Sequence, residues 1–291
     1  MRADLHVHTT ASDGACTPGE VVSAAAQAGF DLLAVTDHDT IGGIRAAMAR
    51  AQELGMALLP GVELSVVSAG SDREIHLLGY GLHPDDPGLA AYFDRKERER
   101  EARAQAMVER VRALGMDVRF EEVRAMAGGV ISRSHIAKRM VELGCVGSVK
   151  EAFERFLNPG RPAYVPREAT TMAQGCALLR AAGAVSVLAH PGLLRMGETA
   201  LEACVAEWQG QGLQGLEAFH PSHQANHARF LYGLARRRGL LVTGGSDYHG
   251  EAMRPTHLGD GLAGWESCDA DVRALWHAAG TRCGRLPDEP I

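Results

Sequence analysis

Short runs of apolar residues alternate along most of the chain with longer stretches in which apolar residues recur every three or four positions. The first pattern is typical of buried strands, and the second of helices with one buried face. We expect strands within 4–8, 30–40, 56–65, 73–82, 184–191, 213–221 and 240–250, and helices near 17–29, 41–55, 170–182, 198–209 and 223–238. This alternation predicts an α/β fold with a mostly parallel sheet, either open or closed into a barrel.

The first expected helix carries its own start and stop signals. Thr17 stands before Pro18 and three residues before Glu20, which is the spacing of a capping box with proline at the first helical position. Gly29 is suited to end the helix, because glycine readily adopts the left-handed conformation that follows a last turn.

The pattern changes between about residues 94 and 167. The stretch 91–115 reads AYFDRKEREREARAQAMVERVRALG, with charges of both signs and an apolar stripe formed by Met107, Val108, Val111 and Leu114. This predicts one long helix with a solvated face. Shorter helices are expected near 120–127, 134–143 and 148–157, and NPGRPAYVP reads as an extended linker. We therefore expect a small helical insert over 94–167, capping the strand ends of an α/β domain made of 1–93 and 168–291.

Nearly every expected strand ends in side chains that bind metals well. His6 and His8 lie two positions apart on the first strand, so their side chains point to the same side. The later strands end in or carry Asp37, His38 and Asp39, then Glu63, His76, His190, then Glu217, His220 and His223, and last Asp247 and His249. One such pair is ordinarily a pair of satisfied histidines. Repetition at the carboxyl edge of the sheet, where active sites of α/β folds lie, predicts a metal site instead.

Composition narrows the class of protein. With 291 residues, 46% of them hydrophobic, the chain can form one large domain or a domain with an insert. A formal net charge of -6 argues against coating nucleic acid through overall positive charge, but it leaves a local anion site open. The 6 cysteines form no CxxC pair, and we find no signal peptide or long apolar segment. We expect a cytoplasmic protein with reduced thiols, no membrane contact and no evident protein partner.

Seven motifs together resemble one known family. They are DLHVHTTASDG, VTDHDT, GVELS, HLLGYGL, LAHP, GLEAFHPSH and GSDYHG, in this order. They resemble the PHP (polymerase and histidinol phosphatase) family of metal-dependent phosphoesterases over about 1–90 and 170–250. The resemblance implies a distorted (β/α)7 barrel. Through ISRSHIAKRM, the insert resembles the subgroup of 3′,5′-nucleoside bisphosphate phosphatases and RNase AM-type exoribonucleases.

The resemblance also implies up to three divalent metal ions and their ligands. The first ion would take His6, His8, Glu63 and Asp247; the second Glu63 as a bridge with His76 and His190; the third Asp13, His38 and His249. Mixed imidazole and carboxylate ligands favour Mn²⁺, with Zn²⁺ or Fe²⁺ as alternatives. Because the ions would carry more charge than the ligating carboxylates, the pocket would select an anion, and close ions would activate a bridging water.

Other residues are candidates for substrate contact and proton transfer. In the insert, Ser132, Ser134, His135 and Lys138 surround Arg133, which can bind a phosphate bidentately near a helix start. An ordinary capped helix with surface charges is the alternative explanation. His223 is expected to contact the reacting phosphoryl group or protonate the leaving oxygen, and Asp37 to handle protons beside His38.

These residues predict a phosphatase that releases the 3′-phosphate of nucleoside 3′,5′-bisphosphates, with the insert as a substrate cap. A 5′→3′ exoribonuclease acting on short 5′-phosphorylated RNA, a histidinol phosphatase and a PHP module kept only for binding remain alternatives. A serine nucleophile is disfavoured, because Ser246 lies outside any GxSxG elbow.

Overall fold

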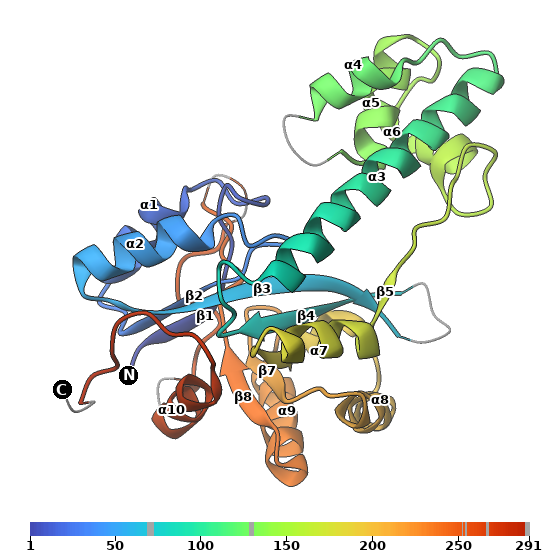
Figure 1. Ribbon diagram of the computed structural model, residues 1–291. Helices are drawn as coiled ribbons and strands as arrows, with labels where there is room; N and C mark the ends of the chain where they lie inside the picture. Colours follow the sequence, from blue (N-terminus) through green and yellow to red (C-terminus); the bar gives the residue numbers. More distant parts are fainter. Residues whose placement is uncertain (69–72, 128–130, 252, 254, 266–267, 289–291) are drawn as a thin grey trace. The chain divides into compact units, whose positions relative to one another are not determined.

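The computed structural model describes all residues except 69–72, 128–130, 252, 254, 266–267 and 289–291 (Figure 1). The chain divides into two compact units. The first, the barrel unit, consists of residues 1–90 and 169–291, and the second, the insert, of residues 91–168.

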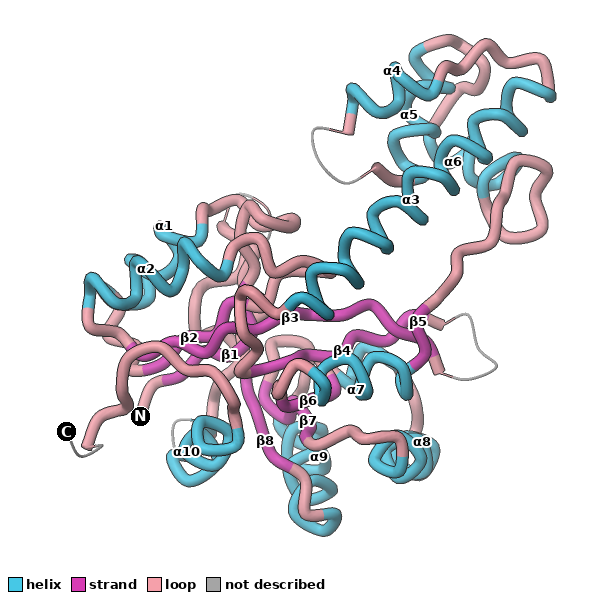
Figure 2. The backbone as a smooth tube through the Cα atoms, in the orientation of Figure 1, coloured by secondary structure: helices cyan, strands magenta, loops and turns pink. Residues whose placement is uncertain are grey.

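The barrel unit is built on one sheet that is nearly closed on itself (Figures 1 and 2). Its strands are β1 (Ala3–Val7), β2 (Leu32–Val35), β3 (Ala57–Val67), β4 (Glu74–Tyr80), β6 (Val185–Leu188), β7 (Gly215–Phe219) and β8 (Leu241–Gly244). In the described residues they pair in the order β1-β2-β3-β4-β6-β7-β8, while the short β5 (Thr170–Thr171) pairs with β3. A bridge between Val7 and Tyr248 links the two edges. The predicted distorted barrel is confirmed.

The distortion arises mainly at β4. This strand pairs antiparallel with both β3 and β6, whereas the other neighbours along the sheet run parallel. The strands are buried on both faces, as the unbroken apolar run of β2 shows, because side chains fill the interior and helices cover the outside.

Helices surround the sheet as the apolar periodicity predicts. They are α1 (Pro18–Gln27), α2 (Ile44–Leu54), α7 (Met172–Ala181), α8 (Glu198–Gly210), α9 (Ala225–Arg238) and α10 (Asp269–Ala278), with a 3₁₀ turn, η2 (Pro191–Leu194), after β6. The capping box at the start of α1 is present: Glu20 N donates to Thr17 Oγ1 at 3.3 Å and Thr17 N to Glu20 Oε2 at 2.7 Å. The helix α10 and the short β5 were not predicted.

The insert has an apolar core of its own. It contains α3 (Pro87–Ala113, which begins in the barrel unit), α4 (Phe120–Met126), α5 (Arg133–Glu142) and α6 (Val149–Ala152), which continues as a π-helical turn, η1 (Phe153–Leu157). Met107, Val108 and Val111 of α3 are buried in this core as predicted. Leu114 is 45% exposed, because α3 ends one residue earlier and Gly115 leaves the helix at a φ of +87°.

Among the described residues, we find no helix with the length and apolar character needed to cross a bilayer.

Candidate metal centre

The side chains predicted as metal ligands gather at one edge of the barrel sheet. His6 lies on β1, Glu63 on β3, and His190 two residues after β6. His76 is near the start of β4, yet it reaches the same edge because β4 runs antiparallel and pairs His76 with Ser65 near the end of β3. The reversed strand thus brings a residue from its beginning to the place where the parallel strands end.

Glu63 occupies the middle of this group and is fully buried. Its two oxygens face different histidines. Oε1 lies 2.8 Å from His76 Nδ1 and 2.9 Å from His190 Nε2. Oε2 lies 3.2 Å from His6 Nε2, 3.2 Å from His8 Nε2 and 3.1 Å from His38 Nδ1. This is the arrangement expected of a carboxylate that bridges two cations.

The first predicted ligand set comes together completely. Ligand atoms of His6, His8, Glu63 and Asp247 all lie within 4.8 Å of one another. Asp247 Oδ1 is 3.2 Å from His8 Nε2 and 3.6 Å from His6 Nε2. Two ligands that each bind one ion at about 2.1 Å lie roughly 3–3.5 Å apart, so these separations suit a shared ion.

The ligand atoms of the other two predicted sets also lie close together, and each set has one further histidine beside it. His8 joins Asp13, His38 and His249 within 4.8 Å. In this set His249 Nε2 lies 3.3 Å from Asp13 Oδ1. In the second set, His190 Nε2 lies 2.9 Å from Glu63 Oε1 and 3.3 Å from His76 Nδ1, and His38 groups with Glu63 and His76. His8 and His38 therefore lie between neighbouring sets.

Unpaired buried nitrogens indicate that these residues fit metal ions. Among the described residues, neither ring nitrogen of His8 forms a well-oriented hydrogen bond, nor does Nε2 of His249, although carboxylate oxygens lie 3.2–3.3 Å from His8 Nε2 and His249 Nε2. A buried polar atom left without a partner costs about 1–3 kcal/mol. Coordination to a cation would satisfy these nitrogens, and the mixed imidazole and carboxylate donors are those that divalent transition metals take.

The electrostatics keep the carboxylates charged. Burial alone would raise the pKa of Glu63, but the surrounding imidazoles hold that pKa well below its usual range. Burial likewise opposes ionisation of Asp247, and contacts with His220 and His8 hold its pKa below the usual range. Burial would lower the pKa of His76, but its bonds to Glu63 and Glu74 raise that pKa to about 10.

Glu217, to which the sequence analysis gave no role, contacts two of the predicted ligand residues. It is fully buried on β7. Its Oε1 lies 2.9 Å from His6 Nδ1, and its Oε2 accepts the backbone N–H of His190 at 2.6 Å. A carboxylate can only accept here, so Nδ1 of His6 carries a proton, which leaves Nε2, 3.2 Å from Glu63 Oε2, as the ring nitrogen that could bind a metal ion. Glu217 also holds the backbone of His190, whose φ is +28°.

His220 lies beside a third predicted ligand residue. Its Nδ1 accepts the backbone N–H of Ser222 at 3.0 Å, and its Nε2 lies 3.7 Å from Asp247 Oδ2. His6, Glu217 and His220 also form a cluster of metal-ligand types. Because His6 Nδ1 lies at hydrogen-bond distance from Glu217 Oε1, we interpret this cluster as a support for the neighbouring predicted ligands. The signal in the sequence was present: Glu217 and His220 follow the same strand-end pattern as the predicted ligands.

Asp37 supports the loop that carries Asp13. Its Oδ1 accepts from Thr9 N and from Ser12 Oγ, both at 2.7 Å, and its Oδ2 accepts from Thr9 Oγ1 at 2.8 Å. These bonds describe a structural role, and the proton-handling role of Asp37 stays a prediction.

His223 is also engaged by backbone groups. Its Nδ1 donates to Ala218 O at 3.0 Å, and its Nε2 accepts the N–H of Gly192 at 3.0 Å. Burial lowers its pKa to about 4, so the ring is neutral. Because this arrangement leaves no ring nitrogen available for proton transfer, the catalytic role of His223 stays a prediction that the contacts do not favour.

The predicted anion-binding residues lie in the insert, at the start of α5. Ser132 and His135 cap the helix: Ser132 N donates to His135 Nδ1 at 3.1 Å. Arg133 donates to Leu157 O at 3.2 Å and lies over the rings of Phe153 and Tyr164. Ser134 and Lys138 are exposed. Four of the five residues thus lie at the start of α5, and Lys138 lies in the middle of the helix.

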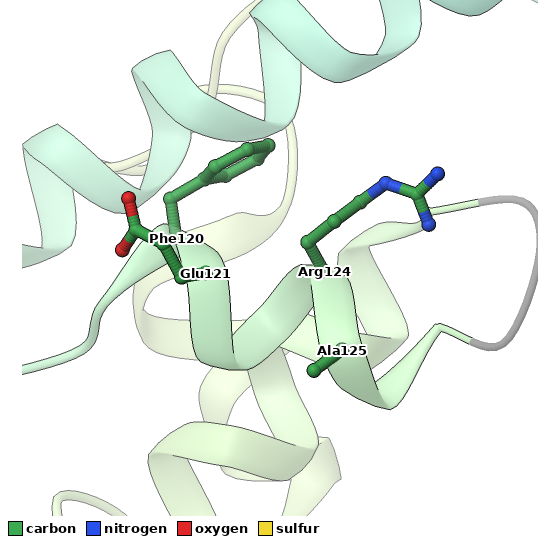
Figure 3. A pocket seen from close by; sticks show the side chains of 4 residues that line it. All are labelled: Phe120, Glu121, Arg124 and Ala125. Carbon is green, nitrogen blue, oxygen red and sulfur yellow. The ribbon is translucent and has the colours of Figure 1, made fainter.

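A shallow depression on α4 is lined by none of the predicted site residues. Phe120, Glu121, Arg124 and Ala125 line it (Figure 3). Arg124 pairs with Glu101 at 2.7 Å, so its charge is already balanced. We assign no chemistry to this depression.

Known proteins resemble the chain over most of its length. The family model described as PHP domain matches residues 4–81. The chain is 34% identical to a 3′,5′-nucleoside bisphosphate phosphatase of Chromobacterium violaceum, covering 98% of this chain and 99% of that protein. It is 33% identical to the 5′-3′ exoribonuclease Rnm of Escherichia coli, covering 84% of each.

A solved structure supports the same relationship. A Bifidobacterium adolescentis protein ascribed to the metal-dependent phosphoesterases superposes with a TM-score of 0.70 at 30% identity, covering 96% of each chain.

Proposed function

The chain belongs to the PHP family of metal-dependent phosphoesterases, and from that premise we propose that it releases the 3′-phosphate of nucleoside 3′,5′-bisphosphates. The products are a 5′-mononucleotide and inorganic phosphate. The main observation in favour of metal-dependent chemistry is the position of the Glu63 carboxylate. Its two oxygens face two separate groups of histidines.

The predicted ligands would hold up to three divalent ions, for which Mn²⁺ is favoured. Bound ions would supply an activated water and neutralise charge on the transferred phosphoryl group. Three further residues of the chain orient the predicted ligands or lie against them. Glu217 sets the tautomer of His6, His220 lies behind Asp247, and Asp37 holds the loop of Asp13.

The choice of a nucleotide rests on the insert and on the relatives. Arg133 offers a guanidinium fork suited to a phosphate, in the same segment as Ser132, Ser134, His135 and Lys138. The Chromobacterium relative, which is similar over nearly the full length, acts on nucleoside bisphosphates by its name. In this proposal the insert contacts the 5′-phosphate, while the barrel residues act on the 3′-phosphate.

A panel of phosphate esters tests the proposal. We expect the Mn²⁺-loaded protein to release phosphate fastest from a nucleoside 3′,5′-bisphosphate, more slowly from a 3′-monophosphate, and least from a 5′-monophosphate or histidinol phosphate. Equal rates on all four esters, or a preference for histidinol phosphate, would overturn the assignment. Full enzymatic turnover in the presence of excess chelator would contradict a metal-dependent mechanism.

A second candidate function is 5′→3′ exonuclease action on short 5′-phosphorylated RNA. The resemblance to the Escherichia coli exoribonuclease favours it. A 5′-phosphorylated trinucleotide separates the two candidates: an exonuclease releases mononucleotides from it, whereas a phosphatase restricted to bisphosphates leaves it intact. A module kept only for binding would hold metal and turn over neither substrate.

A further inference from the structure

The turn that follows β7 places two histidines beside two different predicted ligand residues. A backbone bond closes this turn, from His223 N to His220 O at 2.9 Å. The ring of His220 reaches Asp247, with 3.7 Å between Nε2 and Oδ2. The ring of His223 instead contacts η2, the short turn that begins directly after His190. The contact of His223 is therefore with the backbone next to a predicted ligand.

His190 requires support because its backbone is strained. Its φ of +28° and ψ of +57° lie in the left-handed region, which a residue other than glycine adopts only at a cost in free energy. The sheet does not impose this conformation, since the pairing of β6 with β7 ends at Leu188 and Leu216, two residues before His190. Contacts beyond the paired strands must hold it.

Two side chains supply such contacts between β7 and the residues that follow β6. Glu217 Oε2 accepts the backbone N–H of His190 at 2.6 Å. The His223 ring joins two backbone groups, because Nδ1 donates to Ala218 O at 3.0 Å and Nε2 accepts the N–H of Gly192 at 3.0 Å. The imidazole thus connects β7 to η2 where backbone pairing between the two segments has stopped.

The fit between His223 and Gly192 is close. A Cβ atom at position 192 would lie 2.5 Å from Cδ2 and 2.9 Å from Nε2 of His223. The φ of Gly192 lies outside the left-handed region, so the close approach of the ring, and not the backbone conformation, requires glycine here. An apolar side chain could fill the same space. Only a side chain with one donor and one acceptor, such as a neutral imidazole, can form both bonds.

We propose that His223 is a positioning residue of the metal centre. It holds η2 against β7 and thereby keeps His190 in the conformation that places its Nε2 2.9 Å from Glu63 Oε1. The inference rests on the proposed function, in which His190 binds a metal ion, and deepens it by giving His223 a task other than proton transfer. Loss of the bond to Gly192 should weaken the second ligand set and leave the first and third intact.

Two substitutions separate the two bonds of the ring. In His223→Gln the amide oxygen lies near the former position of Nε2 and can accept from Gly192. In His223→Asn the amide NH₂ lies near the former position of Nδ1 and can donate only to Ala218. The metal content per chain is measured by mass spectrometry after loading with Mn²⁺ and dialysis. His223→Asn should lose a single ion, and His223→Gln should retain the content of the unmodified protein.

Affinity gives a second readout of the same variants. Competition with a chromophoric chelator should show that the weakest-bound ion of His223→Asn is held about 10–100-fold less tightly than in the unmodified protein, the usual effect of losing an outer contact to a ligand. The matched control is His227→Asn. The ring of His227 lies 5.2 Å from that of His223, and its Nε2 has no hydrogen-bond partner in the described part of the chain. This control should bind metal normally.

Gly192→Ala tests the contact from its other side and replaces the His223 variants if these fail to fold. The new Cβ would displace the ring, so this variant should lose the same ion as His223→Asn. Gly197→Ala is its control, because a Cβ there meets no atom within 4 Å. Full metal binding by His223→Asn or by Gly192→Ala would overturn the positioning role. Equal losses in His223→Gln and His223→Asn would also overturn it.

The same measurements distinguish the other two roles of a histidine at this position. Lower stability of every His223 variant with unchanged metal content would show that the ring only packs. Full metal content with a lost kcat in both His223→Gln and His223→Asn would show proton transfer. Either result contradicts the positioning role.

The positioning role and the proposed function can fail separately. If His223→Asn loses an ion but the unmodified protein releases no phosphate from a 3′,5′-bisphosphate, the positioning role stands and the proposed reaction falls. If the bisphosphate is hydrolysed but metal content is independent of His223, the reaction stands and the positioning role falls.

Discussion

At the scale of single residues, the two fully buried carboxylates Glu63 and Glu217 contact different groups of the candidate metal centre. Glu63 is surrounded by five histidine rings at 2.8–3.2 Å. Glu217 lies behind them and contacts the ring of His6 and the backbone of His190. Both carboxylates are fully buried, so replacement of either leaves buried groups without their partners.

We expect Glu217→Gln to weaken metal binding without removing a ligand. An amide presents one oxygen and one NH₂ group, so it can accept from His6 Nδ1 or from His190 N, but not from both. Loss of such support typically reduces metal affinity by about 10–100-fold. Competition with a chromophoric chelator measures this change. The control is Glu207→Gln, the same change at an exposed position. An affinity equal to that of the unmodified protein would show that Glu217 does not position His6.

Arg133→Ala should separate substrates by their 5′-phosphate. Hydrogen bonds to charged groups contribute about 1.5–3 kcal/mol, so kcat/KM for a 3′,5′-bisphosphate should fall by about one to two decades. A 3′-monophosphate offers nothing to Arg133, and its kcat/KM should stay unchanged. Steady-state phosphate release measures both. Equal losses on the two substrates would indicate that Arg133 acts on folding or on the reacting phosphate.

At the scale of elements, the centre depends on how closely β8 approaches β1. Gly245 follows β8, and a Cβ atom at this position would lie 2.2 Å from Cβ and 2.6 Å from N of His6. Only glycine allows the two backbones to come this near. The edge that closes the barrel is therefore also the edge that places His6 among the other ligands.

Gly245→Ala should destabilise the fold and disturb the centre together. Overpacking of this kind costs about 1–3 kcal/mol, and the group displaced here is the backbone of a ligand residue. Chemical denaturation and the metal content per chain measure the two effects. Gly197→Ala is the control, since its Cβ would meet no atom within 4 Å. Native stability and full metal content in Gly245→Ala would contradict this account of barrel closure.

At the scale of the whole molecule, we expect metal binding to be coupled to the release of protons. In the metal-free protein His76 has a pKa raised to about 10, because its bonds to Glu63 and Glu74 outweigh the effect of burial. At pH 7 this imidazole is therefore protonated. A metal ion bound at His76 would take the place of that proton.

Metal loading at pH 7 should consequently release protons. Since the proton on His76 competes with the metal below a pKa of about 10, metal affinity should rise as the pH rises from 6 to 9. Titration calorimetry in two buffers with different ionisation enthalpies measures the number of protons released. Heats that are independent of the buffer, or an affinity that falls with rising pH, would contradict the coupling.

Local patterns in the sequence alone determined the order of the strands and helices other than α10 and β5, the cap at Thr17, and the residue types at the strand ends. These features depend on periodicity and on neighbours a few residues away, so they can be predicted before the chain is folded. The pattern Glu217-x-x-His220 was equally visible, but its supporting role was not, since it depends on contacts with His6 and Asp247 that lie far away in the chain.

Only the tertiary structure decided the orientation of β4, the histidines that each oxygen of Glu63 faces, and the meeting of Arg103 with Arg133 at Tyr164. The physical reason is the same in each case. A periodic pattern encodes which side of an element is buried, whereas the partner of a buried ring nitrogen or guanidinium depends on packing between segments that the sequence separates. His223 is an example. Histidine is suited to proton transfer, but both ring nitrogens of His223 form hydrogen bonds with backbone groups of β7 and η2 in the folded chain.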